Sequence, residues 1–214
     1  MRVVTDEEAK INELFVRLNK GKALTGAELR NAMGGVVPGL IRDLAQHQFF
    51  TTYISFSSSR RQADNVAAKL LLMEFRGNFV DTKKIHLDRF VEEGRNAEAQ
   101  TAEFAQAKNR CVSTLAGMTN VFRTKDPLLR SQGPITVYYW LVRSTPEVRH
   151  PLIREFLIRF DEDRKANRKA MKGNAASADS ELLNYDVLDR STNDQGSIEA
   201  RFEILRHRFA DWQP

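Results

Sequence analysis

The densest group of basic residues in this sequence is a tract in its C-terminal third. Residues 164–172 read RKANRKAMK and contain no acidic residue. Cations at this density can neutralise the phosphates of a nucleic acid, and they also suit the carbonyl end of a helix. We therefore predict that the tract is either a phosphate-contact surface or a solvated helix end. Its cations are Arg164, Lys165, Arg168, Lys169 and Lys172.

A second group of polar residues surrounds a predicted turn near the N-terminus. A helix that begins at about Asp6 should stop at residues 19–21, and Thr25 and Glu28 have the spacing of a capping box that begins the next helix. Free N–H groups at that helix start, together with the nearby cations, would attract phosphate. In the alternative interpretation Asn19 caps the first helix, the lysines are solvated and Arg30 pairs with an acid. The candidate residues are Arg17, Asn19, Lys20, Lys22, Arg30 and Asn31.

The same stretch carries a resemblance to a known family. The pattern F-V-R-L-N-x-G-x-x-L-x-x-x-E-L-R-N-A, from Phe15 to Ala32, resembles a segment in the N-terminal, ParB-like domain of the GmrSD-type restriction endonucleases. Members of that family take part in defence against foreign, often modified, DNA, including that of phages. They couple nucleotide hydrolysis to DNA cleavage. The resemblance implies that this chain belongs to a DNA-targeting restriction system.

The chain departs from the family pattern in one important respect. In the family, an α/β half with an Asp-Gly-Gln-Gln-Arg motif precedes this helix pair and is assigned nucleotide binding and hydrolysis. No Asp-Gly or Gln-Gln pair occurs here, and no His-Asn-His nuclease domain is recognisable. The chain therefore resembles the helical second half of the domain, with Val3-Val4 as the expected remnant of its last strand.

These departures define what we expect of the chain alone. We predict no catalytic residues, no metal site and no cofactor in it, and hence no nucleotidase or nuclease activity on its own. The resemblance implies a nucleotide and a divalent metal only in the intact protein. The implied partners are the ParB-like half, or a sister subunit, and DNA. The alternative is a non-enzymatic helical module that binds nucleic acid or protein.

Composition favours a polyanion partner without requiring one. The 214 residues include 33 Lys and Arg against 28 Asp and Glu, which gives a net charge of +5. The lone cysteine, Cys111, cannot form an internal disulfide, and its place on an apolar stripe predicts a buried small hydrophobe. No basic-then-apolar leader and no long uncharged span is visible. We expect a cytoplasmic protein with no membrane partner, and we leave its oligomeric state open.

Every periodic segment has a hydrophobic repeat close to that of a helix, and none alternates as a strand would. We therefore predict an all-α multihelical bundle of roughly eight helices in a single domain, 1–214. Within it we distinguish the helices of the family pattern (1–50), a central bundle (60–172), a loop-rich segment (173–197) and a terminal helix (198–212).

The sequence also predicts the boundaries of five individual helices. A very apolar helix should run from Gln62 to near Gly77, and Asp81 or Thr82 should cap the next one. Residues 96–123 should form the longest helix. Thr145 should cap a helix with Pro146 in its first turn. Ser197 should cap the terminal helix and leave Arg201, Arg206 and Arg208 outside.

Overall fold

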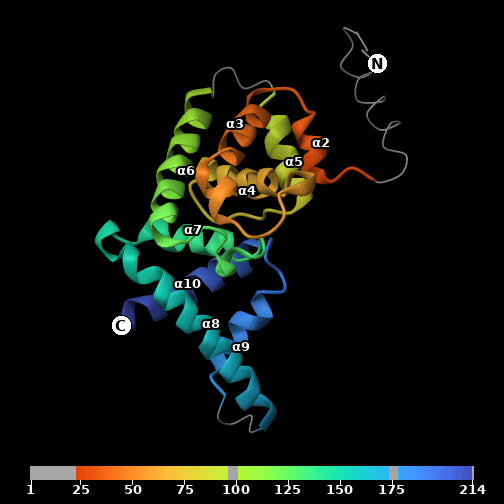
Figure 1. Cartoon of the computed structure of the whole chain (residues 1–214). Coiled ribbons are helices and arrows are strands. Elements are labelled where there is room, and N and C mark those ends of the chain that lie inside the picture. The colour runs from red at the N-terminus through yellow and green to blue at the C-terminus, as the bar shows by residue number, and fades with distance from the viewer. Residues whose placement is uncertain (1–22, 96–100, 174–177, 214) are drawn as a thin grey trace.

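Helix α4 (Gln62–Arg76) lies at the centre of the protein, and most of its residues are buried. The computed structural model describes residues 23–95, 101–173 and 178–213 (Figure 1). Ten consecutive or near-consecutive α4 residues between Ala63 and Glu74 are buried, and the helix packs against α3 and α6 on its two sides. It ends at Gly77, whose φ of 69° is the left-handed conformation that glycine adopts at little cost. The prediction of a central helix ending there is confirmed.

The other helices form two groups that meet at α7. The upper group in Figure 1 holds α2 (Gly26–Asn31), α3 (Val36–Ala45), α5 (Lys84–Glu93) and α6 (Thr101–Val121) around α4. The lower group holds α8 (His150–Gly173), α9 (Ser180–Leu188) and α10 (Gln195–Asp211). Helix α7 (Ile135–Ser144) packs against α4 and α6 on one side and α10 on the other. Short helical turns occupy Phe49–Tyr53, Ser59–Arg61, Pro127–Leu129 and Glu147–Arg149.

This architecture is the all-α multihelical fold that the hydrophobic periodicity predicts. Eight of the helices in the described ranges have nine or more residues, and those ranges contain no strand. Val3-Val4, the expected strand remnant, and the helix expected from Asp6 lie outside the described residues. None of the described helices combines the length and apolarity needed to cross a membrane.

A buried carboxylate joins α7 to two helices of the upper group. Glu74 of α4 has no exposed surface, and it accepts hydrogen bonds from the Tyr139 hydroxyl at 2.6 Å and from Arg143 Nε at 2.6 Å. Arg110 Nε of α6 donates to it at 3.0 Å. A buried charge is tolerated only with this degree of hydrogen bonding, so Glu74 ties α4, α6 and α7 into one arrangement.

Cys111 lies close to this carboxylate and is fully buried, as its apolar position predicts. Burial first, and then the charge of Glu74, raise the pKa of its thiol to about 12. The thiol is therefore protonated and unreactive at neutral pH.

Two of the predicted helix starts in the middle of the chain are wrong. Helix α5 follows Lys83, which makes no side-chain cap, whereas Asp81 Oδ1 accepts a hydrogen bond from the backbone N–H of Gln195 at the start of α10. Thr145 Oγ1 donates back to the Leu141 carbonyl at 2.7 Å instead of capping the next helix. A short turn over Glu147–Arg149 intervenes, and α8 begins only at His150.

The C-terminal region differs most from the sequence-based prediction. The segment expected to be rich in loops, 173–197, contains helix α9, which Asp179 caps through hydrogen bonds from the N–H groups of Glu181 and Leu182. Helix α10 begins at Gln195, before the expected cap Ser197. At 24 residues α8, and not the 21-residue α6, is the longest helix in the described ranges.

Arg201 was expected on the outside of α10 but is completely buried. It stands three residues after Ile198 and four before Leu205, so it lies on the same buried face of the helix as these two residues. Its Nη2 lies 2.9 Å from Asp189 Oδ1 and donates to the Gly133 carbonyl at 3.2 Å. This non-local ion pair permits the burial, and the local sequence pattern does not reveal it.

Candidate nucleic-acid interface

Two polar loops lie side by side between the upper and lower helices. The first follows the helical turn Phe49–Tyr53 and contains the serines of residues 55–59; the second, residues 122–134, joins α6 to α7. Backbone N–H groups of Lys125 and Asp126 donate to the carbonyls of Thr52 and Tyr53 at 3.1 and 2.9 Å. Ser55 N donates in return to Leu129 O at 3.2 Å. The two loops are thus held in a fixed register.

Asp126 is the residue that organises the second loop. It is fully buried, and its carboxylate accepts hydrogen bonds from Arg154 Nε at 2.8 Å and from the N–H groups of Arg123 and Leu128 at 2.9 and 3.1 Å. Its carbonyl accepts the Ser55 hydroxyl at 2.8 Å. Burial alone would raise the pKa of Asp126, but these donors outweigh it and lower the pKa, so the carboxylate is ionised at neutral pH.

The loop that Asp126 anchors carries three exposed cations. Arg123, Lys125 and Arg130 each extend from it, and no side-chain hydrogen bond or ion pair joins any of them to another described residue. Lys125 has a φ of 51°, a left-handed conformation that costs a non-glycine residue about 1 kcal/mol or more. The flanking backbone hydrogen bonds hold it there. We call Arg123, Lys125 and Arg130 the cationic loop.

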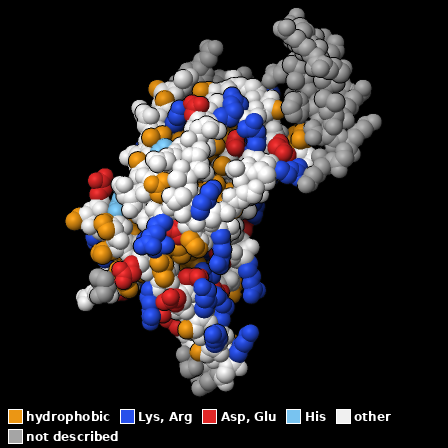
Figure 2. Space-filling view, viewed as in Figure 1, with side chains coloured by type: hydrophobic (Ala, Val, Ile, Leu, Met, Phe, Trp, Pro, Cys, Tyr) orange, Lys and Arg blue, Asp and Glu red, His pale blue; other side chains and the backbone are white. Residues whose placement is uncertain are grey.

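A groove of about 780 Å³ runs beside the cationic loop. Its rim includes Ser57, Ser58, Arg61 and Lys125, and its floor includes the buried residues Phe50 and Ile54. Hydroxyl groups and cations in this arrangement match the donors that proteins use to bind phosphate oxygens. In the space-filling view of Figure 2, Lys and Arg side chains occur from the top to the bottom of the visible face, and acidic side chains lie among them in its upper and lower parts.

The capping box that the sequence predicts is present and contacts Arg60, next to the groove residue Arg61. Thr25 Oγ1 accepts the N–H of Glu28 at 3.2 Å, and Thr25 N donates to Glu28 Oε2 at 2.7 Å. Glu28 also forms an ion pair with Arg60 at 3.1 Å, which holds Arg60 in a left-handed conformation with φ of 55°. Arg61, also left-handed, pairs with Asp64 at 2.9 Å. The start of α2 therefore contacts the serine loop through Arg60, and the N–H groups of Thr25 and Glu28 are occupied within the capping box.

The candidates around the predicted turn fall into two sets. Arg17, Asn19, Lys20 and Lys22 lie outside the described residues. Arg30 is 3% exposed and pairs with Asp88 Oδ1 at 2.9 Å and with Asn65 Oδ1 at 2.7 Å. The side-chain oxygen of Asn31 accepts a hydrogen bond from Arg42 Nη1 at 3.3 Å. Arg30 thus joins α2 to α4 and α5, which is the ion-pairing alternative that the sequence left open.

The tract 164–172 is divided between paired and free cations. Arg164 lies 2.6 Å from Asp186 and 3.2 Å from Asp189, and Arg168 lies 2.8 Å from Asp186, so both join α8 to α9. Lys165 pairs with Asp161 one turn earlier on α8, at 2.7 Å. Lys169 and Lys172 are exposed and have no partner within the described ranges. These two lysines are the members of the tract that are available to a phosphate.

A second, smaller cleft links the cationic loop to this tract. Its volume is about 170 Å³, and Arg130, Ser131 and Arg164 are among its lining residues. The positive charge of Arg164 is already paired with Asp186 and Asp189, and its guanidinium carbon lies 4.5 Å from the centre of the Tyr185 ring. Arg130 is therefore the cation in this cleft that is free of described partners.

No family model matches this chain, and the searches of curated proteins and of solved structures returned no match either. Within the described ranges, no three His, Cys, Asp or Glu side chains are grouped so that they could hold a metal ion.

Sequence reasoning did not single out the cationic loop. The three cations are spread over eight residues, interrupted by Asp126 and Pro127, and so form no dense tract. The available signal was the Asp-Pro turn between two apolar helices with basic residues on either side. The structure shows that Asp126 is buried and that its negative charge is paired with Arg154. Asp126 therefore does not neutralise the cations that flank it in the sequence.

Proposed function

We propose that this chain contacts the sugar-phosphate backbone of DNA as the helical portion of a GmrSD-like defence protein. In this proposal a ParB-like nucleotidase half, carried by another chain or another part of the protein, supplies nucleotide hydrolysis. The sequence pattern from Phe15 to Ala32 supports the family part of the proposal. The cationic loop, held by Asp126 beside a serine-lined groove, supports the phosphate contact and is the observation that carries it.

The charge pattern favours phosphate over an acidic protein surface. Recognition of a sugar-phosphate backbone needs exposed cations and hydroxyl donors held in fixed positions by the protein. It needs no side chains that recognise particular bases. Arg123, Lys125 and Arg130 meet the first condition, and Ser58, which has no hydrogen-bond partner among the described residues, meets the second. Four loop-to-loop hydrogen bonds hold the two loops in position. Lys169 and Lys172 would extend the contact along the duplex.

The salt dependence of duplex binding tests this proposal. Each phosphate contact contributes about −0.9 to the slope of log affinity against log salt concentration. Replacing Arg123, Lys125 and Arg130 by Gln should therefore flatten that slope by roughly 2 to 3 units, without changing sequence preference. Fluorescence anisotropy with labelled duplexes of two unrelated sequences, over a series of salt concentrations, measures both quantities.

A control variant removes the same charge from another surface. Lys83, Lys84 and Arg89 lie in or next to α5, are exposed, and line neither the serine-rich groove nor the cleft beside it. Their replacement by Gln should leave the slope close to that of the wild type. Equal slopes for the cationic-loop variant and the wild type would contradict the phosphate contact.

The family part of the proposal has a separate test. If this chain works with a ParB-like half, an adjacent reading frame should encode the Asp-Gly-Gln-Gln-Arg motif, and nucleotide hydrolysis should appear when the two are combined. A genomic neighbourhood without that motif, together with intact DNA binding, would favour the alternative of a non-enzymatic helical binding module.

A further inference from the structure

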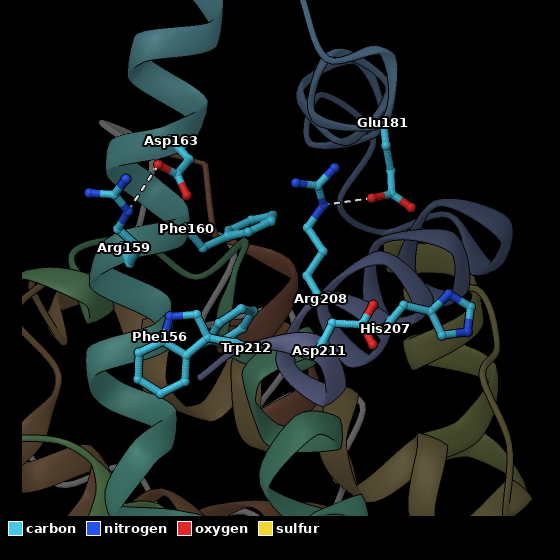
Figure 3. Close-up of a pocket in the computed structure, with 9 residues that line it drawn as sticks. All are labelled: Phe156, Arg159, Phe160, Asp163, Glu181, His207, Arg208, Asp211 and Trp212. Carbon is cyan, nitrogen blue, oxygen red and sulfur yellow. Dashed lines mark hydrogen bonds and ion pairs between the residues drawn. The ribbon is translucent and has the colours of Figure 1, made fainter. Parts of the chain in front are cut away.

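A cleft among α8, α9 and α10 lies apart from the cationic loop and has a different chemistry. Its volume is about 390 Å³, which is within the range of sites for small ligands. Phe156 and Phe160 of α8 lie on one side, and Trp212, just after the end of α10, covers one end (Figure 3). The Trp212 and Phe156 rings are 6.0 Å apart, edge to face. Phe156 and Phe160 are almost fully buried, so the ring surface that the cleft offers to a ligand is that of the partly exposed Trp212.

The charged groups around these rings leave a net negative site. Arg159 is paired with Asp163 at 3.1 Å, and Arg208 is paired with Glu181 at 2.5 Å and with Asp179 at 2.7 Å, as the dashed lines to Asp163 and Glu181 in Figure 3 mark. Both guanidinium groups are therefore compensated. Asp211, the third carboxylate in the lining, has no ion-pair or hydrogen-bond partner in the part of the chain that the structure describes.

The end of α10 adds to this negative potential. The helix ends at Asp211, so its last carbonyl groups and their partial negative charge lie beside the cleft. Aromatic faces attract cations through their quadrupole, most strongly in the case of tryptophan. The protein already uses this interaction nearby, since the guanidinium of Arg149 lies 4.4 Å from the centre of the Phe209 ring, and Phe209 packs on Phe156.

We propose that this cleft binds a guanidinium group, with its flat face on the ring of Trp212 and its charge attracted by the free carboxylate of Asp211. The group could arrive on a small guanidino compound or on an arginine side chain of a partner peptide, since both present the same planar cation. This inference does not depend on the nucleic-acid contact, because a site with a free carboxylate and a helix carbonyl end repels phosphate.

Nuclear magnetic resonance of the indole N–H groups tests the proposal with the full chain. The protein has two tryptophans, so the Trp212 signal is assigned by its loss in Trp212→Phe, and the buried Trp140 serves as an internal reference. N-acetyl-arginine amide, titrated at constant ionic strength, should shift the Trp212 signal saturably and leave the Trp140 signal in place. N-acetyl-citrulline amide has nearly the same shape without the charge, and it should produce little or no shift.

The charge of Asp211 provides the second measurement. Asp211→Asn should weaken binding of the arginine amide about two- to fivefold, the range expected for one exposed charge pair. Glu199→Gln removes an exposed carboxylate from α10 that does not line the cleft, and it should leave the affinity unchanged. Equal responses to arginine and citrulline amides, or equal affinities of Asp211→Asn and the wild type, would overturn the proposal.

The source of the guanidinium group is decided by comparing ligands of different size. A tetra-arginine peptide that binds more tightly per residue than the single amide points to a partner's side chain. Equal affinity per guanidinium points to a small guanidino compound. Either outcome requires the saturable Trp212 shift, and its absence with both ligands refutes the site.

Discussion

Replacing Lys69 by methionine should stabilise this protein, because Lys69 is a buried lysine without an acidic partner among the described residues. It projects from α4 and is 5% exposed. The neighbouring charges are the cations Arg30 and Arg201, whose own partners are Asp88 and Asp189. Burial first, and then the charges of these two arginines, lower the pKa of Lys69 from 10.5 to about 8.

The size of the effect follows from this shift in pKa. A pKa lowered from 10.5 to about 8 corresponds to roughly 3 kcal/mol of unfavourable free energy while the lysine is charged in both the folded and unfolded states. This cost is fully present below about pH 8. Between pH 8 and 10.5 the unfolded chain binds the proton and the folded protein does not, so the stability of the wild type rises with pH. Methionine has a similar length and no charge, and should recover most of the cost at neutral pH.

Urea unfolding of the wild type and Lys69→Met over a range of pH provides the assay. We expect the variant to be more stable by about 1 to 3 kcal/mol at pH 7, and about half of that difference to remain at pH 9.5. Other groups that titrate in this range are common to both proteins and cancel in the difference. Lys169→Met, a matched change at an exposed lysine, should alter the stability by no more than about 0.5 kcal/mol. A variant less stable than the wild type at pH 7, or a difference independent of pH, would refute the reasoning.

The other predictions concern residues that hold the helices and loops in place. Asp126→Asn should lower the free energy of unfolding by about 3–5 kcal/mol, because it breaks a buried ion pair with Arg154. The pKa of Asp126 is lowered in the folded protein, so the difference in unfolding free energy between variant and wild type should shrink as the pH falls below about 3.8. Glu74→Leu should lower the free energy of unfolding by a similar amount, because it leaves Arg110 and Arg143 without their ion-pair partner. Denaturant midpoints measure this effect, and an unchanged midpoint would mean that the ion pairs of Glu74 do not stabilise the fold. Arg164→Gln should increase amide hydrogen exchange in α9, because it removes the ion pair to Asp186, whereas Lys169→Gln should not. Equal exchange in the two variants would mean that the contact to Asp186 does not hold α9 in place.

The fold class and the central helix could be predicted because both follow from local periodicity. The burial of α4, the glycine at its end and the capping box of Thr25 and Glu28 all depend on residues within a few positions of one another. Arg201 could not be placed in this way. Its helical position puts it on a buried face, but its charge is acceptable there only because Asp189, on another segment, pairs with it.

The candidate interface was difficult to predict for the same reason. Charge density in the sequence drew attention to residues 164–172, whereas the structure shows that Asp186 and Asp189 compensate two of those cations across helices. In the cationic loop the opposite holds, because the one nearby acid in the sequence, Asp126, is turned inward. Pairing between distant segments thus decides which cations remain available, and a single sequence does not show that pairing.

Disulfide cross-linking to DNA tests the central claim most directly. Cys111 is buried and its thiol pKa is raised to about 12, so an introduced cysteine would be the one reactive thiol in a Ser57→Cys variant. With a duplex that carries a thiol tethered to one phosphate, cysteine at position 57, on the rim of the serine-lined groove, should form a protein–DNA disulfide. Cysteine at Ser180, an exposed position at the start of α9, should not. Equal cross-linking at the two positions, or none at position 57, would contradict the account.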